Sequence, residues 1–286
     1  MIGDLLLAPF ADFMFMRRAL VGSIAIAIGA APIGVFLTLR RMSLTGDAIA
    51  HGILPGAAVG YLIAGLSLTA LTIGGLVAGM AVAIAAAIVS RSTVQREDAS
   101  LAAFYLISLA LGVLLISLRG GAIDLQSFLF GSVLGLDDQA MFLLVGISAI
   151  TLAGLALIYR PLLMESFDPA FLRQVSRTGP LSHFAFLALA VLNLVAGFHA
   201  LGTLMAVGIM ILPAAAARFW ARSLGRMIAV AMAIAAASCI VGLLVSFHLD
   251  VPSSPAIILS AGLAYLLSVA FGRVSGLATR RVSATA

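Results

Sequence analysis

Long runs of residues without charge dominate this sequence and restrict the folds open to it. A helix needs about 20 apolar residues to cross the hydrocarbon core of a bilayer. Only 9% of the residues are charged, whereas about a quarter are charged in ordinary soluble domains. The uncharged runs, one of them interrupted only by a histidine, lie at 19–39, 52–90, 99–118, 140–159, 184–217, 227–247 and 251–272. We therefore expect the chain to be embedded in a membrane.

Two of these runs are too long for a single crossing, so the chain is expected to turn within each. The turns are expected near Gly65 to Ser67 and between Gly197 and Gly202. Backbone groups in hydrocarbon must be hydrogen-bonded within a helix or a closed barrel, and continuously apolar runs exclude a barrel. The predicted fold is all-α, a polytopic transmembrane helix bundle of eight or nine spans that forms one domain over residues 1–286. The candidate spans are roughly 19–39, 48–65, 68–90, 99–118, 140–159, 181–198, 202–217, 227–247 and 254–272.

The basic residues predict the orientation of these spans. All 16 are arginines, and they lie almost wholly between the apolar runs, so they indicate membrane topology instead of a stripe that binds nucleic acid. With nine spans, one side carries Arg40, Arg41, Arg91, Arg96, Arg160, Arg173, Arg177, Arg218, Arg222, Arg226, Arg273, Arg280 and Arg281, and the other carries Arg17, Arg18 and Arg119. The first side is expected to be cytoplasmic, with the C-terminus inside. Arg17 and Arg18 fit this scheme poorly, and with eight spans they would lie inside as well.

Several kinds of chemistry are excluded by residues that the sequence lacks. A phosphate-binding P-loop requires a lysine, and the chain contains none. It has no H-E-x-x-H motif for a metalloprotease, and its four histidines are scattered. Cys239 is the only cysteine, so a disulfide framework and a thiolate metal cluster are both excluded. We therefore expect a transport protein that is not itself an enzyme and holds no permanent cofactor.

Asp47 and His51 are the strongest candidates for a site on the transport path. They lie in GDAIAHGILPG, residues 46–56, four residues apart at the start of an apolar run, so a helix presents both on one face. Ionisable residues within spans mark transport paths, and a carboxylate with an imidazole suits zinc or manganese. Asp47 is equally suited to cap the helix start, with His51 an ordinary polar residue. The pair supplies two ligands where zinc usually has four, so a second copy in a dimer would complete the set.

Asn193 and His199 form a weaker candidate, a secondary position on the path. His199 lies at the expected turn between two spans, and Asn193 precedes it by about one and a half turns. A gate or second metal stop is one interpretation. A hydrogen bond between helices and an ordinary turn residue are the favoured alternative.

A basic segment, LPAAAARFWARSLGRM at 212–227, is of a different kind. Pro213 is expected to interrupt a helix, and Arg218, Arg222 and Arg226 then recur every four residues. This spacing predicts a short basic helix on the Arg-rich surface, suited to docking in the groove of a partner. An ordinary positively charged loop is the alternative.

Several segments together resemble one family. They are RRMSLTGDAIAHGILPGAAVGYL, DLQSFLFGSVLG, ESFDPAFLRQV, LGTLMAVGIMILPAAAAR and VPSSPAIILSAGLAYLLS, in matching order over roughly residues 15–272. GDAIAHGILPG and LPAAAAR are specific in combination, although each is weak alone. The chain resembles the permease of bacterial zinc/manganese ABC importers, which are relatives of the cobalamin and siderophore permeases.

The resemblance implies a homodimeric permease in the bacterial inner membrane, served by cytoplasmic ATP-binding subunits and an extracytoplasmic metal-binding protein. Its metal site falls here on Asp47 and His51, four ligands from two copies, and its ATPase-coupling segment falls on residues 213–226. Zn²⁺ is the expected cargo, with Mn²⁺ or iron as the alternative. Counting spans places Asp47 near the cytoplasmic end, so a broken segment around residues 42–50 is expected if the site lies deeper. A secondary metal or proton transporter and a membrane scaffold are rival interpretations.

Overall fold

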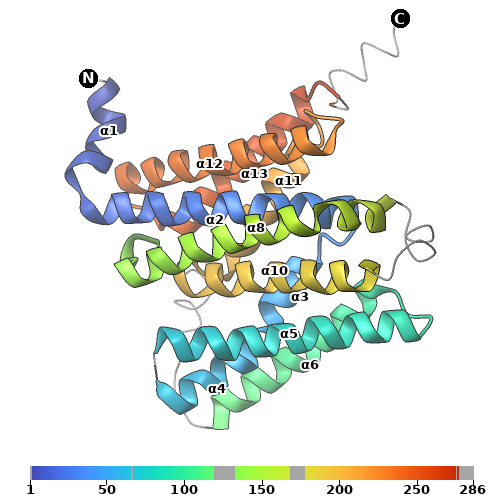
Figure 1. The fold of residues 1–286 in the computed structure, drawn as a ribbon. Coiled ribbons are helices and arrows are strands. Elements are labelled where there is room, and N and C mark those ends of the chain that lie inside the picture. The colour runs from blue at the N-terminus through green and yellow to red at the C-terminus, as the bar shows by residue number, and fades with distance from the viewer. Residues whose placement is uncertain (1, 66, 119–132, 168–177, 275, 277–286) are drawn as a thin grey trace, which may run out of the picture.

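The computed structural model describes residues 2–65, 67–118, 133–167, 178–274 and 276. Within these ranges all regular secondary structure is helical, without a β-strand (Figure 1). The elements are α1 (Ile2–Asp12), α2 (Met14–Leu39), α3 (Thr45–Gly52), α4 (Leu54–Ala64), α5 (Leu68–Ser92), α6 (Glu97–Leu118), η1 (Val133–Gly135), α8 (Asp138–Phe167), α10 (Thr178–Leu201), α11 (Thr203–Ala217), α12 (Leu224–Leu249) and α13 (Ser253–Phe271). The predicted all-α polytopic bundle is confirmed.

Among the described residues, 8 helices are long and apolar enough to cross a membrane, with α3 and α4 together counted as one. The helix α11 differs, because its 15 residues extend only about 22 Å at 1.5 Å per residue, less than the roughly 30 Å hydrocarbon core. It packs among α2, α10, α12 and α13. The predicted ninth span is therefore a short helix enclosed by its neighbours.

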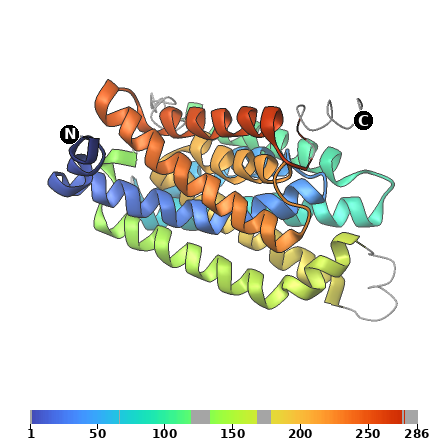
Figure 2. The ribbon, with the colours of Figure 1, turned by 90° about the horizontal axis from the view of Figure 1, so that it is seen from above.

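Successive helices run in opposite directions, which gives the bundle two distinct ends (Figures 1 and 2). At one end α2, α5, α8, α11 and α13 finish and α6, α10 and α12 begin. We call it the Arg-rich end, because it carries Arg40, Arg41, Arg91, Arg96, Arg218, Arg222, Arg226 and Arg273. Arg17 and Arg18 lie at the opposite end, where Arg18 Nε is 2.7 Å from Asp138 Oδ1.

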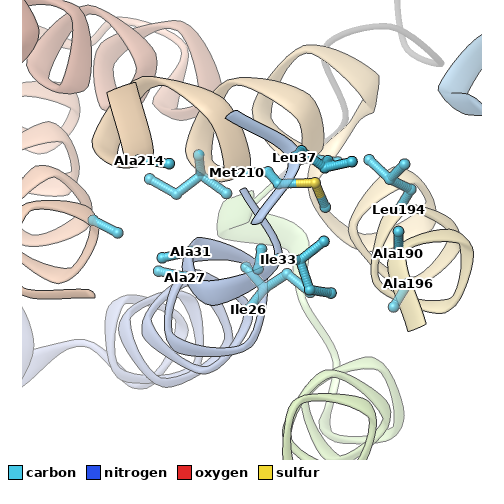
Figure 3. Close-up of a cluster of buried hydrophobic side chains, with 14 of the residues drawn as sticks. Ile26, Ala27, Ala31, Ile33, Leu37, Ala190, Leu194, Ala196, Met210 and Ala214 are labelled. Atoms are coloured by element: carbon cyan, nitrogen blue, oxygen red, sulfur yellow. The ribbon is translucent and has the colours of Figure 1, made fainter. Parts of the chain in front are cut away.

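The core lies where α2, α10 and α11 meet, around Ile33 and Leu37 of α2, Leu194 of α10 and Met210 of α11 (Figure 3). Small residues allow these helices to approach closely. A Cβ at Gly34 would overlap the backbone carbonyl of Met210, so only glycine fits there. Close approach through small residues is the usual way that helices associate in membranes, where apolar burial alone favours no partner over lipid.

The second span is broken and takes an unusual course. After α2 the chain turns through Arg41, whose φ of 58° is rare for a residue other than glycine, and Figure 1 shows α3 running across the direction of the longer helices. The helix is interrupted at Ile53, and α4 starts with Pro55 in its first turn, where the missing N–H of proline is tolerated. The break at Ile53 thus lies beyond residues 42–50, where it was expected. Within that range, residues 42–44 form a turn and α3 begins at Thr45.

Candidate metal site

Asp47 and His51 lie on the same face of α3. His51 Nε2 is 3.6 Å from Asp47 Oδ1, and the side chains are 31% and 60% exposed, respectively. The rest of the helix, including Ala48, Ile49 and Ala50, is buried against α5, α6, α10 and α11. The α3 helix therefore turns its apolar side to the bundle and its two ligand-type side chains outward.

The structure does not support Asp47 as the helix cap. The N-cap position is Leu44, and no side-chain capping hydrogen bond is made there. Asp47 is the third helical residue and lies within the first turn of α3. Its carboxylate gains from the positive end of the helix dipole, but its oxygens are not engaged as a cap would require.

The two side chains lie within ion-pair distance but make no hydrogen bond to each other. The separation of 3.6 Å exceeds hydrogen-bond length, and the buried Nδ1 of His51 has no hydrogen-bond partner among the described residues. The ring of Tyr105, on α6, lies with its centroid 6.2 Å from that of the imidazole. An oxygen and a nitrogen that are near each other, on one face, and not bonded to each other can both turn toward a cation.

One chain provides only part of a metal site. No group of three or more His, Cys, Asp or Glu residues that could hold a metal occurs within the part of the chain that the structure describes. A carboxylate on a membrane helix is costly against lipid and is found facing a cavity or another polar group. The exposed face of α3 is therefore suited to an aqueous path or to a second copy of itself.

The structure does not join Asn193 to this pair. Asn193 is 1% exposed and donates to Thr151 Oγ1 of α8 and to the carbonyl of Leu189 in its own helix. The bond to Thr151 holds α10 against α8. This is the hydrogen bond between helices that was the favoured interpretation of Asn193. His199 lies in the last turn of α10, and its side chain lies outside the described part.

The predicted basic helix is wrong. Pro213 lies within α11, which continues to Ala217, and α12 begins at Leu224, so residues 218–223 form the turn between them. The aromatic residues between the arginines anchor this turn: Trp220 Nε1 donates to Ser268 Oγ at 2.8 Å, and the carbonyl of Phe219 accepts from Val274 N–H. Local backbone bonds continue only as far as Ala221, which donates to the carbonyl of Ala217, and the tertiary bonds of Phe219 and Trp220 fix the turn that follows α11.

A partly buried cluster of charged residues at the Arg-rich end was not singled out by the sequence. It consists of Arg40, Arg91, Glu97, Glu165 and His183, which come from five different segments. Their only signal in the sequence is a position at or near the ends of spans. They are far from one another along the chain, and no local spacing connects them.

The chain matches the model of the ABC 3 transport family over residues 12–272. It is 33% identical over 257 residues to the manganese import system permease protein ScaB of Streptococcus parasanguinis, covering 90% of each chain. It is 32% identical over 270 residues to the manganese transport system membrane protein MntC of Halalkalibacterium halodurans, covering 94% of this chain and 91% of the relative. The chelated iron transport system membrane protein YfeD of Yersinia pestis is 28% identical over 283 residues, with 99% and 94% covered.

Among solved structures, PsaBC from Streptococcus pneumoniae in complex with Fab superposes with a TM-score of 0.84 at 30% identity and covers 100% of both chains. An inward-facing conformation of a metal-chelate type ABC transporter superposes with a TM-score of 0.65 at 18% identity, with 88% and 85% covered. The second similarity shows the fold alone. The family match spans nearly the whole described bundle, including α3 with Asp47 and His51, and the chain belongs to the ABC 3 transport family.

Proposed function

We propose that this chain is the permease of an ABC importer that carries a divalent transition metal, manganese in the first place, into the cytoplasm. The observation that carries the proposal is the outward face of α3, where Asp47 and His51 lie 3.6 Å apart, without a hydrogen bond between them, within a membrane-embedded bundle. Membership of the ABC 3 transport family supports a transport role for this pair over a structural one.

The site is completed by symmetry. Two copies of the chain that meet along the exposed faces of α3 bring two carboxylates and two imidazoles together, which removes the shortage of ligands in one chain. Two carboxylate oxygens and two imidazole nitrogens suit a first-row divalent ion. Because the ligands are few, the ion can also be released. The metal is cargo, held briefly between entry and exit.

The orientation follows the arginines. The Arg-rich end faces the cytoplasm, in agreement with the concentration of basic residues on that side of membrane proteins, and the opposite end receives metal from an extracytoplasmic metal-binding protein. The ATP-binding subunit docks at the turn of residues 218–223 and at Arg226, the first-turn arginine of α12. Energy enters there, because the chain has no P-loop of its own.

The identity of the metal rests on two arguments that point in different directions. Relatives named for manganese, ScaB and MntC, and one named for chelated iron, YfeD, support manganese or iron. The imidazole ligands favour zinc by their chemistry. We place manganese first, since similarity over the whole chain constrains the path more than two side chains do, and zinc second.

The test is metal entry into proteoliposomes that hold the chain together with its ATP-binding subunit, measured ion by ion with and without ATP. ATP-dependent entry of Mn²⁺ is expected. Asp47→Ala and His51→Ala are each expected to lower it by at least about tenfold, because each copy loses one of two ligands. Asp12→Ala, which removes an exposed acid at the end of α1, is the matched control and leaves entry unchanged. Equal entry without the ATP-binding subunit, or normal entry in both site variants, would refute the proposal.

A further inference from the structure

Five charged or ionisable side chains meet in a partly buried cluster at the Arg-rich end, in which Arg40, Glu165 and His183 lie deepest and Arg91 reaches the surface. Each comes from a different helix or its edge: Arg40 directly follows α2, Arg91 belongs to α5, Glu97 starts α6, Glu165 lies near the end of α8, and His183 lies near the start of α10. The cluster therefore joins the ends of five helices. We call it the Arg40–Glu165–His183 cluster.

Glu165 holds two guanidinium groups at once. Arg40 Nη2 is 3.2 Å from Glu165 Oε2, and Arg91 Nη2 is 3.2 Å from Glu165 Oε1. The side chains of Arg40 and Glu165 are only 8% and 11% exposed, so this pair is shielded from screening by water. Each guanidinium also lies over an aromatic ring of α10, that of Phe186 or Phe184.

His183 connects Arg40 to Glu97 through both of its ring nitrogens. Nδ1 is 2.9 Å from Arg40 Nη1, and Nε2 is 2.9 Å from Glu97 Oε1. A guanidinium group can only donate hydrogen bonds, so Nδ1 must be the acceptor and the ring proton must lie on Nε2, facing the carboxylate. His183 is therefore neutral in this arrangement: it accepts a hydrogen bond from Arg40, and its Nε2 lies in close contact with Glu97 Oε1 without the geometry of a hydrogen bond.

The cluster borders a hollow of about 680 Å³. Arg40, Glu165, Glu97 and His183 line one part of it, and the exposed Arg96 lines another. Buried charges that lose their partners are strongly destabilising in an apolar interior. A hollow of this size has room for water, which hydrates ions that separate and so lowers the cost of parting them.

The cluster is also directly connected to the helix that carries the metal ligands. Arg40 is followed by Arg41 with its left-handed φ of 58°, then by the buried Met42, and α3 starts at Thr45. A movement of the Arg40 end of α2 therefore changes the course of α3 through a short turn whose backbone has little freedom.

We propose that the Arg40–Glu165–His183 cluster is a latch that closes the Arg-rich end of the permease and fixes the position of α3 until metal is released. This inference rests on the proposed function, because it takes the Arg-rich end as the exit. In the closed state the five helix ends are held together by the ion pairs and by the neutral His183. In the open state the ions are hydrated by the hollow, the helix ends part, and metal leaves.

The test measures entry of Mn²⁺ into proteoliposomes that hold the whole complex, in the absence of ATP. His183→Ala cuts the connection between Arg40 and Glu97, and we expect ATP-independent entry to rise about tenfold, the shift expected when a charge-assisted hydrogen bond no longer favours the closed state. His183→Gln is expected to stay at the native level, because its amide can accept from Arg40 and donate to Glu97 while remaining neutral. Arg96→Ala is the control in the same hollow, and it is also expected to stay at the native level.

A second variant, Glu165→Gln, keeps the size of the side chain and removes the charge that holds both arginines. It is expected to raise ATP-independent entry as His183→Ala does, and it keeps the test decisive if His183→Ala does not fold. The latch would be overturned if His183→Ala and Glu165→Gln both fold and show ATP-independent entry at the native level. It would also be overturned if His183→Gln and His183→Ala show equal entry. Failure of the proposed function is distinguished by the native complex, which would then show no ATP-driven entry of metal.

Discussion

Gly34 sets how closely α2 approaches α11, and a methyl group at this position tests the packing of the core. A Cβ built on Gly34 overlaps the carbonyl of Met210 and also lies 3.2 Å from the Cβ of Ala214. The obstacle is backbone, which cannot rotate away as a side-chain end can. Gly34→Ala must therefore push two central helices apart.

The size of this effect follows from overpacking. Inserting a methyl group into a filled core costs about 1–3 kcal/mol, and more where backbone has to move. Gly146→Ala on α8 is the matched control, because nothing lies within 4 Å of a Cβ there. Alanine in an open helical position is favoured over glycine by up to about 1 kcal/mol, so the two variants are expected to move stability in opposite directions and to differ by roughly 1–4 kcal/mol.

The assay is thermal unfolding of the purified protein in detergent, followed by loss of the monodisperse peak in size-exclusion chromatography. Unfolding of membrane proteins in detergent is commonly irreversible, so native and variant proteins are compared at one heating rate. Gly34→Ala is expected to unfold on the order of 5 °C below the native protein, and Gly146→Ala at or slightly above it. Unfolding of Gly34→Ala at the native temperature would mean that α2 and α11 are not in contact at this point.

Three further outcomes follow from the described contacts. Asp138→Asn removes the ion pair between Asp138, 60% exposed, and Arg18, 32% exposed. Exposed pairs contribute about 0–1 kcal/mol, so the unfolding temperature is expected to change little, and a large fall would contradict this. Trp220→Phe removes the 2.8 Å hydrogen bond to Ser268 Oγ and is expected to lower the free energy of unfolding by about 1 kcal/mol. The variant should therefore unfold at a lower temperature, and an unchanged temperature would mean that the bond is not formed. Arg218→Ala is expected to weaken co-purification of the ATP-binding subunit, and unchanged recovery would count against docking at this turn.

The sequence alone determined the class of the protein and the position of its candidate ligands. Runs of apolar residues report directly on the solvent that surrounds a helix, so the all-α membrane bundle could be predicted without any knowledge of packing. The four-residue spacing of Asp47 and His51 places them on one face of any helix that contains both, and the structure has them there. Both predictions depend on local geometry only.

Tertiary structure decided what local geometry leaves open. The spacing of Arg218, Arg222 and Arg226 is helical, but bonds from Phe219 and Trp220 to the end of α13 make a turn there instead. The Arg40–Glu165–His183 cluster joins residues up to 143 positions apart, and nothing in their neighbours along the chain marks them as partners. Such features depend on which helices pack together. In a membrane, close approach of small residues and pairing of buried polar groups determine the partners. Neither leaves a periodic pattern within a single segment of the sequence.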